Sequence, residues 1–374
     1  MHGSLARPDG LDRMLHMLVD ALPRQGVNVR TPGTAAPLAR AAGDEIAQAP
    51  AHAQTGFVGG LLRRVYPGPR EVEPPRNPDL VALHSAPYAA PMLGKFGKVP
   101  RVVHFHGSWS DERRTERSVA MLGMLRYGLE RIVYLGGTRL IVQSLEAGDV
   151  LNVRYRVPED RIRVVPACVD ASRYAVRANR RQVRKLLNMP HDRPVVLCVR
   201  PLLAGVGLEE LIDAIFVVKQ TVRDVYVMIV GTGPNEHWLN ARIDARGLER
   251  HVFLRGFVPD DVLPQYYRAA DLTVVPTVAM KDCGLTAIES LATGTPVLVT
   301  AAGGLAETVT PLCEELVLPL GGYQELASGI SDALLGVRFT PSGDACRRYA
   351  RKHFDHSIVA AQTAEIYRDA IDSF

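Results

Sequence analysis

Residues 276–296 read PTVAMKDCGLTAIESLATGTP and form the most informative stretch of the sequence. It follows a short apolar run, residues 272–275, which has the length of a buried strand. We expect a turn through Gly284, a helix over residues 285–292 and a stop at Gly294. A strand, a glycine-containing turn and a helix N-terminus together predict a site for an anion or a hydroxyl group, because the backbone N–H groups of the first helical turn point outward.

The composition is that of a globular protein rather than a fibrous or membrane-spanning one. The chain has 374 residues, 47% apolar and 22% charged, which is long enough for two domains. Residues 1–20 already carry charges, so no secretory leader is predicted. The five cysteines are far apart, which favours reduced thiols and a cytoplasmic location over a metal centre. A net charge of +4 fits an anionic ligand and does not call for nucleic acid.

Strands alternate with helices along the whole chain, which indicates parallel βαβ units. In the first half, strands are predicted over residues 27–29, 80–84, 101–105, 139–143 and 162–165. In the second half, they are predicted over residues 195–199, 226–230, 252–255 and 272–275. The pattern therefore predicts an α/β protein with two Rossmann-like, doubly wound parallel-sheet domains. Ligands in such sheets bind beyond the carboxyl ends of the strands.

The boundaries follow from where the strand–helix pattern restarts. We expect an N-terminal, acceptor-side domain over residues 1–175, joined near residues 170–190 to a C-terminal, nucleotide-sugar-binding domain over residues 190–350. The remaining segment, residues 351–374, carries a helix that we expect to cross back to the first domain. Only Met1 and His2 precede Gly3, where the first strand of this domain is expected. Either translation begins further upstream, or the first domain lacks this strand.

The opening stretch resembles the donor-sugar signature of the GT-B glycosyltransferases of family 4. The matching positions are Pro276, Gly284, Glu289, Ala292, Gly294, Pro296 and Val297. Further segments stand in family order: VVHFHGSW, VVPACVD, VGTGP, ATGTPV and GGLAE. The resemblance implies two domains facing across a cleft. It also implies transfer of a sugar from a nucleotide-diphosphate sugar to an acceptor with retention of configuration, without a metal or other cofactor.

The resemblance also implies site residues. His106 ends a strand and precedes Gly107, where the family has a histidine beside the donor sugar, and Lys281 stands where the family has a sugar-binding glutamate. We take these two as the catalytic candidates. The nucleotide-sugar-binding candidates are Gly10, Arg200, Gly231, Gly233, Pro234, Phe257, Val258, Asp282, Cys283, Gly284, Leu285, Glu289, Gly303 and Gly304. Among them, Glu289 is expected to hold the ribose hydroxyls.

Several family positions depart from the pattern. The family places an arginine and a lysine after the first strand of the second domain, and the aligned residues here are Pro201 and Val206. Arg200 is one residue early, and a shift of one residue in a strand usually turns a side chain the other way. The family's Gly-Gly loop is Asp9-Gly10 here. The usual cations of the diphosphate site are therefore missing from their places.

Two functions follow from this mixture of kept and lost positions. The first is a retaining glycosyltransferase with an unusual donor pocket, whose acceptor is a carbohydrate, a lipid-linked sugar or a small molecule. The second is a catalytically impaired pseudo-glycosyltransferase that binds or regulates an active partner. A nucleotide-sugar epimerase on the same fold has no motif in its favour. The helix over residues 117–133 carries Arg126 and Arg131 beside apolar residues, which allows at most a peripheral membrane contact.

Overall fold

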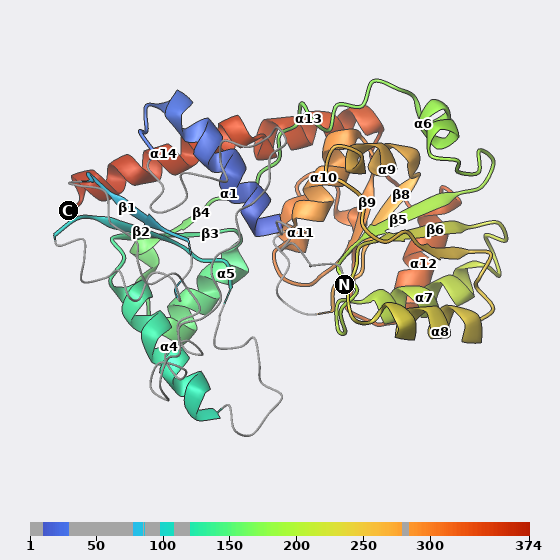
Figure 1. Ribbon diagram of the computed structural model, residues 1–374, viewed down its shortest axis with the longest axis horizontal. Helices are drawn as coiled ribbons and strands as arrows, with labels where there is room; N and C mark the ends of the chain where they lie inside the picture. Colours follow the sequence, from blue (N-terminus) through green and yellow to red (C-terminus); the bar gives the residue numbers. More distant parts are fainter. Residues whose placement is uncertain (1–9, 30–77, 85, 87–97, 108–119, 279–283) are drawn as a thin grey trace, which may run out of the picture. The chain divides into compact units, whose positions relative to one another are not determined.

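A computed structural model describes residues 10–29, 78–84, 86, 98–107, 120–278 and 284–374 (Figure 1). It divides into two compact units. Unit 1 comprises Met1–Val165 and Ala360–Phe374, and unit 2 comprises Pro166–Val359. In both units the described strands are parallel and alternate with helices. The expected α/β architecture with two parallel sheets is therefore confirmed.

The described sheet of unit 1 has the order β1-β2-β3-β4. Its strands are β1 (Val81–Leu83), β2 (Arg101–His104), β3 (Arg139–Val142) and β4 (Ile162–Val164). The longer helices of this unit are α1 (Gly10–Ala21) and α4 (Ala120–Leu135), and α5 (Leu145–Asp149), Val150–Arg154 and Glu159–Arg161 are short turns of helix. Apolar side chains of β2 and β3 are fully buried, which places the core of unit 1 around the middle of the sheet.

The prediction of a strand over residues 27–29 is wrong. Those residues are described but form no strand, and a short 3-10 helix, Leu22–Gln25, lies directly before them. That helix ends at Gly26, whose φ of +80° is a left-handed conformation that suits glycine. Alternating valines favour a strand only when a neighbouring strand completes the ladder, and the described sheet of unit 1 offers none to these residues.

The sheet of unit 2 has six strands in the order β10-β9-β8-β5-β6-β7. The strands are β5 (Val195–Val199), β6 (Tyr226–Val230), β7 (Val252–Leu254), β8 (Leu272–Val275), β9 (Val297–Thr300) and β10 (Val317–Leu318). Every residue of β6, β8 and β9 is buried, as expected of parallel strands covered on both faces.

Helices cover both faces of this second sheet, with α7, α8 and α12 on one side and α9, α10 and α13 on the other (Figure 1). The helices are α6 (Arg180–Leu186), α7 (Leu208–Val218), α8 (Glu236–Ala245), α9 (Leu263–Ala269), α10 (Leu285–Thr293), α11 (Leu305–Val309), α12 (Tyr323–Leu334) and α13 (Gly343–Phe354), with a 3-10 turn at Glu314–Leu316.

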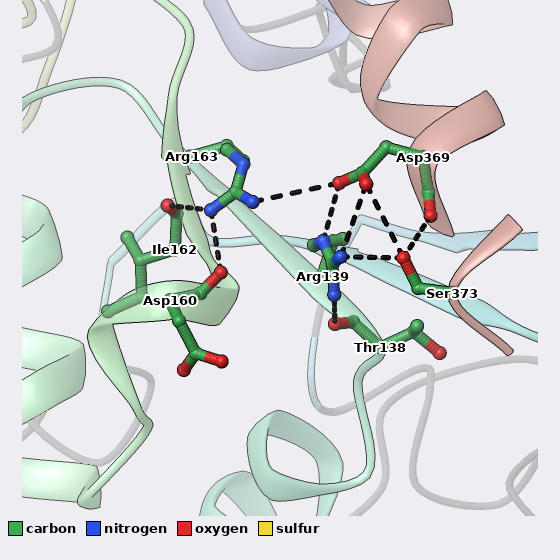
Figure 2. A network of polar contacts seen from close by, with 7 residues as sticks. All are labelled: Thr138, Arg139, Asp160, Ile162, Arg163, Asp369 and Ser373. Atoms are coloured by element: carbon green, nitrogen blue, oxygen red, sulfur yellow. Dashed lines mark hydrogen bonds and ion pairs between the residues drawn. The ribbon is translucent and has the colours of Figure 1, made fainter. Parts of the chain in front are cut away.

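The last helix, α14 (His356–Asp372), attaches to the sheet of unit 1 through polar contacts (Figure 2). Arg139, the first residue of β3, donates from Nε to the Asp369 carboxylate at 2.6 Å, and from Nη2 to the Ser373 hydroxyl at 2.7 Å. Arg163 of β4 lies 3.6 Å from the same carboxylate. The arginines hold the pKa of Asp369 below its usual value, the hydrogen bond from Arg139 being the largest cause. Two neighbouring strands therefore share one acidic partner on α14.

Candidate functional site

In the parallel sheet of unit 2, the order in which strands are added reverses between β5 and β8. Strands β6 and β7 follow β5 on one side, while β8, β9 and β10 lie on the other. Ligands of doubly wound sheets bind at such a switch point, beyond the carboxyl ends of the strands. Arg200 follows β5 and Thr277 follows β8, and the Arg200 Nη2 donates to the Thr277 hydroxyl at 2.8 Å. A guanidinium therefore lies at the position where the fold places an anionic ligand.

The expectation that a shift of one residue turns the Arg200 side chain the other way is wrong, as its bond to Thr277 shows. A shift of one residue reverses a side chain's direction inside a strand, but Arg200 lies beyond the last residue of β5. Its long side chain turns toward the end of β8, as the bond to Thr277 shows. The sequence reasoning missed Thr277, because a threonine after a strand carries no signal until the partner strand is known.

The loop that starts α7 packs directly on the end of β8. Gly207 has a φ of +88°, and a Cβ built there would lie 1.5 Å from the carbonyl oxygen of Pro276. Only glycine fits at such a distance. Pro201 and Val206 belong to the same loop between β5 and α7, so the two positions where the family carries cations lie beside the switch point but are uncharged.

The turn after β6 approaches the turn after β5 with its backbone. A Cβ at Gly231, whose φ is +147°, would lie 1.9 Å from the Arg200 carbonyl oxygen, and one at Gly233 would lie 2.3 Å from that of Leu202. Both glycines are therefore needed for packing between the two turns. Pro234 continues the second turn and precedes the first residues of α8. The turns that were expected to approach a nucleotide lie together at the carboxyl edge of the sheet.

The start of α10 lies against the short helix α11. Gly284 precedes Leu285 with a φ of +76°, and a Cβ there would lie 2.6 Å from the Thr308 hydroxyl of α11. Thr308 donates in turn to the carbonyl of Gly304 at 2.9 Å. The candidates Gly284, Leu285, Gly303 and Gly304 are therefore neighbours. The other three candidates of this loop, Lys281, Asp282 and Cys283, lie outside the described residues.

Glu289 lies in the interior of unit 2. Its side chain is 2% exposed, and one carboxylate oxygen accepts a 2.7 Å hydrogen bond from the hydroxyl of Tyr267, which is fully buried. It is not a solvated helix carboxylate. Tyr267 is a partner that the sequence did not reveal, because it comes from α9 and has no spacing rule that links it to α10. The role of Glu289 in holding a ribose stays a prediction.

The two apolar candidates in the segment after β7, Phe257 and Val258, differ in their exposure to solvent. Phe257 is 50% exposed, whereas Val258 is 7% exposed and belongs to the core. The preceding Gly256 accepts a hydrogen bond from the Gly231 N–H at 2.9 Å, which ties this segment to the end of β6. Phe257 can therefore contact a ligand with its side chain, and Val258 only with its backbone.

Three histidines gather in unit 1 at the carboxyl ends of β1 and β2. His84 directly follows β1, His104 is the last residue of β2, and His106 follows two residues later. The rings of His84 and His104 stack at 4.0 Å between centroids, and His106 Nε2 lies 3.4 Å from His84 Nδ1. His104 Nε2 lies 2.9 Å from the hydroxyl of Tyr367 on α14.

Two of the three histidines, His84 and His104, are held uncharged by their surroundings. Burial first, and then the charge of His106, lowers the pKa of His84 to about 3. Burial, followed by the charges of the other two histidines, also lowers the pKa of His104 well below its ordinary value. Burial raises the pKa of the Tyr367 hydroxyl, so the group that faces His104 stays protonated. At neutral pH, His84 and His104 are therefore neutral hydrogen-bonding rings.

Two expectations in unit 1 change with the structure. Gly10 is the first residue of α1 rather than part of a loop. Arg126 of α4 is buried, at 9% exposure, so it cannot belong to an exposed basic face, although the neighbouring Met124 is 70% exposed. Within the described residues, no helix is both long enough and apolar enough to span a bilayer.

A hollow of about 370 Å³ lies at the opposite edge of the sheet of unit 2. Pro194, Asp271 and Pro296, which line it, directly precede β5, β8 and β9. Asp271 there is bound by Arg184 at 2.6 Å and by Arg180 at 3.0 Å. Because this hollow lies at the amino ends of the strands and Asp271 is paired with two arginines, we treat it as part of the scaffold.

Comparison with known proteins identifies the class that this fold and these turns define. The Glycosyltransferase Family 4 model matches residues 8–173, and the Glycosyl transferases group 1 model matches residues 179–353. The two models together span nearly the whole chain. The protein therefore belongs to the family 4-like glycosyltransferases, and the resemblance drawn from its motifs is confirmed.

Individual relatives are more distant. The chain is 27% identical over 258 residues to 2-deoxystreptamine glucosyltransferase of Streptomyces kanamyceticus, covering 68% of this chain and 65% of the relative. It is 27% identical over 277 residues to 2-deoxystreptamine N-acetyl-D-glucosaminyltransferase of Streptomyces fradiae, covering 69% and 63%. These alignments thus span slightly less than two thirds of either relative.

Among solved structures, HepE of Anabaena in complex with UDP superposes with a TM-score of 0.72 and 19% identity, over 98% of both chains. At this identity the likeness establishes the fold, which is the GT-B fold expected from the sequence. HepE has also been solved with UDP-glucose, with a TM-score of 0.70.

Proposed function

We propose that this protein transfers a sugar from a nucleotide-diphosphate sugar to an acceptor, with retention of the anomeric configuration. The observation that carries the proposal is the guanidinium of Arg200 beside Thr277 at the switch point of unit 2. A parallel sheet binds its ligand at this place, and a guanidinium matches the geometry of phosphate oxygens. The UDP and UDP-glucose bound to HepE, a structural neighbour, support a donor of this class.

In this proposal, the diphosphate is the group that the site of unit 2 must stabilise, since it leaves with the electrons of the glycosidic bond. Arg200 supplies a permanent positive charge. The N–H groups of the first turn of α10, after Gly284, point along the positive end of the helix dipole and can donate to the diphosphate. Donors held in place before the reaction stabilise developing charge without reorganising. Lys281 is assigned to the sugar end of the donor, where the family has a glutamate.

The remaining roles follow the resemblance. Phe257 and Val258 are assigned to the nucleotide base, Glu289 to the ribose and Gly303 to the phosphates. His106 is assigned to the hydroxyl groups of the donor sugar, where a polar contact would help to hold the sugar in the reactive orientation. We propose that no metal ion takes part. The two Streptomyces relatives, both named for the small acceptor 2-deoxystreptamine, support a carbohydrate or small-molecule acceptor.

The test is a donor and acceptor panel with the purified protein. Release of UDP or GDP should depend on both a nucleotide sugar and an acceptor, and it should persist in EDTA. Nuclear magnetic resonance of the product should show the same anomeric configuration as the donor. His106→Ala should lower turnover by about 10²-fold, on the scale of a lost transition-state contact, with little change in melting temperature. Inversion of configuration would refute the retaining mechanism.

The rival function is a pseudo-glycosyltransferase that binds a partner instead of turning over. It is favoured by the uncharged Pro201 and Val206, which stand where the family has two cations. In that case nucleotide sugars should neither bind nor be consumed, whereas an active glycosyltransferase should co-purify with the chain. Measurable transfer by the isolated protein excludes this alternative, and Arg200 is the residue on which the distinction depends.

A further inference from the structure

The histidines at the ends of β1 and β2 form a cluster that the proposed function uses only in part. Ring nitrogens of His84, His104 and His106 lie within 4.8 Å of one another, a spacing compatible with a transition-metal ion. However, His84 and His104 are stacked face to face, with 19° between their planes. An imidazole lone pair lies in the plane of its ring, so one ion cannot lie in line with both stacked rings. The arrangement favours a hydrogen-bonded group over a chelate.

The bond that matters joins His84 to His106. His106 Nε2 and His84 Nδ1 are 3.4 Å apart, and the two rings are tilted by only 14°. One of the two nitrogens must carry the proton while the other offers its lone pair. The bond therefore forms when both rings are protonated on Nε2, or when both are protonated on Nδ1. In the two mixed combinations, N–H faces N–H or lone pair faces lone pair.

The Nε2–H form is the ordinary preference of a neutral histidine, and both rings can adopt it together while making this bond. We propose that His84 is a positioning residue for His106: its Nδ1 accepts the Nε2–H of His106, which fixes the orientation of that ring and leaves the lone pair on His106 Nδ1. Which nitrogen of a histidine is protonated is set by the hydrogen bond that the other one makes. A neutral His106 thus presents an acceptor, not a donor, at Nδ1.

The surroundings support this assignment. The lowered pKa of His84 keeps it neutral, so that it can act as an acceptor at neutral pH. Its ring is also held in place, because it stacks on His104, which in turn contacts the Tyr367 hydroxyl at 2.9 Å. A buried, stacked ring loses less freedom when it makes a hydrogen bond than an exposed one does. The stacking on His104 therefore holds His84 in place for its bond to His106.

The test reads the tautomer of His106 directly. Long-range proton–nitrogen spectra of histidine-labelled protein report which ring nitrogen is protonated, and His106→Gln assigns the signals. We expect the Nε2–H form in the wild type. His84→Phe keeps the stacking on His104 but offers no acceptor, so His106 should become a mixture of tautomers. His84→Asn places a carbonyl oxygen near the position of Nδ1 and should restore the Nε2–H form.

Tyr367→Phe is the matched control, because it removes the contact to His104 and leaves the pair of His84 and His106 in place. It should not change the His106 signals. An unchanged tautomer in His84→Phe, or an Nδ1–H form in the wild type, would overturn the proposal. So would stoichiometric perturbation of all three histidines by added Zn²⁺, since metal ligation would then replace the hydrogen bond.

The activity readout rests on the proposed function, whereas the spectra do not. In the transfer assay, His84→Phe should lower kcat by about 10-fold or more, on the scale of misplacing a reacting group, with KM changed less, and His84→Asn should recover most of the loss. If the protein transfers no sugar at all, the proposed function fails while the spectra still decide the tautomer. If transfer occurs and His84→Phe has wild-type kcat, the positioning role fails alone.

Discussion

Gly207 lies against Pro276 so closely that a Cβ on the glycine would be 1.5 Å from the proline's carbonyl oxygen. The loop after β5 and the end of β8 are thus in backbone contact at the switch point. A similar approach joins the turn after β6 to the turn after β5, where Gly231 faces the carbonyl of Arg200. The edge of the sheet that carries the candidate donor site is therefore built from turns that tolerate almost no added volume.

This close contact predicts the cost of single methyl groups. Gly207→Ala should strongly destabilise the protein or displace the loop, because the new Cβ has no room and φ is +88°. Gly205→Ala is the matched control, since φ there is +74° but nothing lies within 4 Å. It should cost only about 1–2 kcal/mol for the left-handed backbone. Urea unfolding of both variants checks this, and equal losses would show that the contact with Pro276 is not tight.

Arg200 should determine donor affinity. A charge-assisted hydrogen bond contributes about 1.5–3 kcal/mol, so Arg200→Ala should weaken nucleotide-sugar binding by about 10- to 150-fold. Arg223→Ala, which removes an exposed arginine from the loop before β6, should leave binding unchanged. Calorimetry with UDP- and GDP-sugars measures both. Equal affinity of Arg200→Ala and the wild type would remove the guanidinium from the donor site.

Restoring the missing cations should strengthen binding. Two new charge-assisted contacts in Pro201→Arg/Val206→Lys should add about 3–6 kcal/mol, or about 10²- to 10⁴-fold in affinity, if the backbone of the donor site is intact. We accordingly expect the wild type to bind common nucleotide sugars weakly. Tight binding by the wild type, together with no gain in the double variant, would show that Arg200 and the rest of the site already provide the charge.

Stability should fall in mild acid because of the buried histidines. The pKa of His84 is about 3 in the folded protein, against 6.5 ordinarily, and that of His104 is also lowered. Below pH 6.5, His84 and His104 therefore bind protons in the unfolded chain but stay neutral in the folded chain. Each histidine should then remove up to about 1.4 kcal/mol of stability per pH unit, down to about pH 3 for His84, and neither should matter above about pH 7.5.

The variant His104→Phe/Tyr367→Phe isolates one of these histidines. It removes both partners of a buried contact at once, so it leaves no unpaired polar group. Tyr367 does not titrate in this range, because burial raises its pKa. Urea unfolding between pH 4.5 and 7.5 should show about one proton less taken up on unfolding at the acidic end. The same slope as in the wild type would mean that His104 already binds a proton in the folded protein.

Much of the fold could be predicted because buried parallel strands appear in the sequence as continuous runs of apolar residues. β5, β6 and β8 begin and end at the expected residues. Such runs are buried on both faces, so their signal does not depend on a particular neighbour. The prediction of a strand over residues 27–29 was wrong because those three residues show only an alternation of apolar and polar side chains. A strand that short forms only where a neighbouring strand pairs with it.

The candidate site was harder to predict, since its contacts join distant parts of the chain. The bonds from Arg200 to Thr277, from Tyr267 to Glu289 and between His104 and Tyr367 each link different elements. No spacing rule reports such pairs. The motifs located the turns of unit 2 correctly, but the direction of a long side chain beyond a strand end, and the burial of a helix carboxylate, depend on packing that the local sequence does not contain.

The attachment of α14 to β3 and β4 through Asp369 has a consequence for how the protein is made. Unit 2 is one continuous segment, Pro166–Val359, whereas unit 1 needs Ala360–Phe374 to be complete. At roughly 5–20 residues per second, a ribosome adds those last residues on the order of 10 s or more after finishing Val165. Unit 1 is thus begun before unit 2 and completed after it, and the edge of its sheet that binds α14 stays uncovered until Ala360–Phe374 are made.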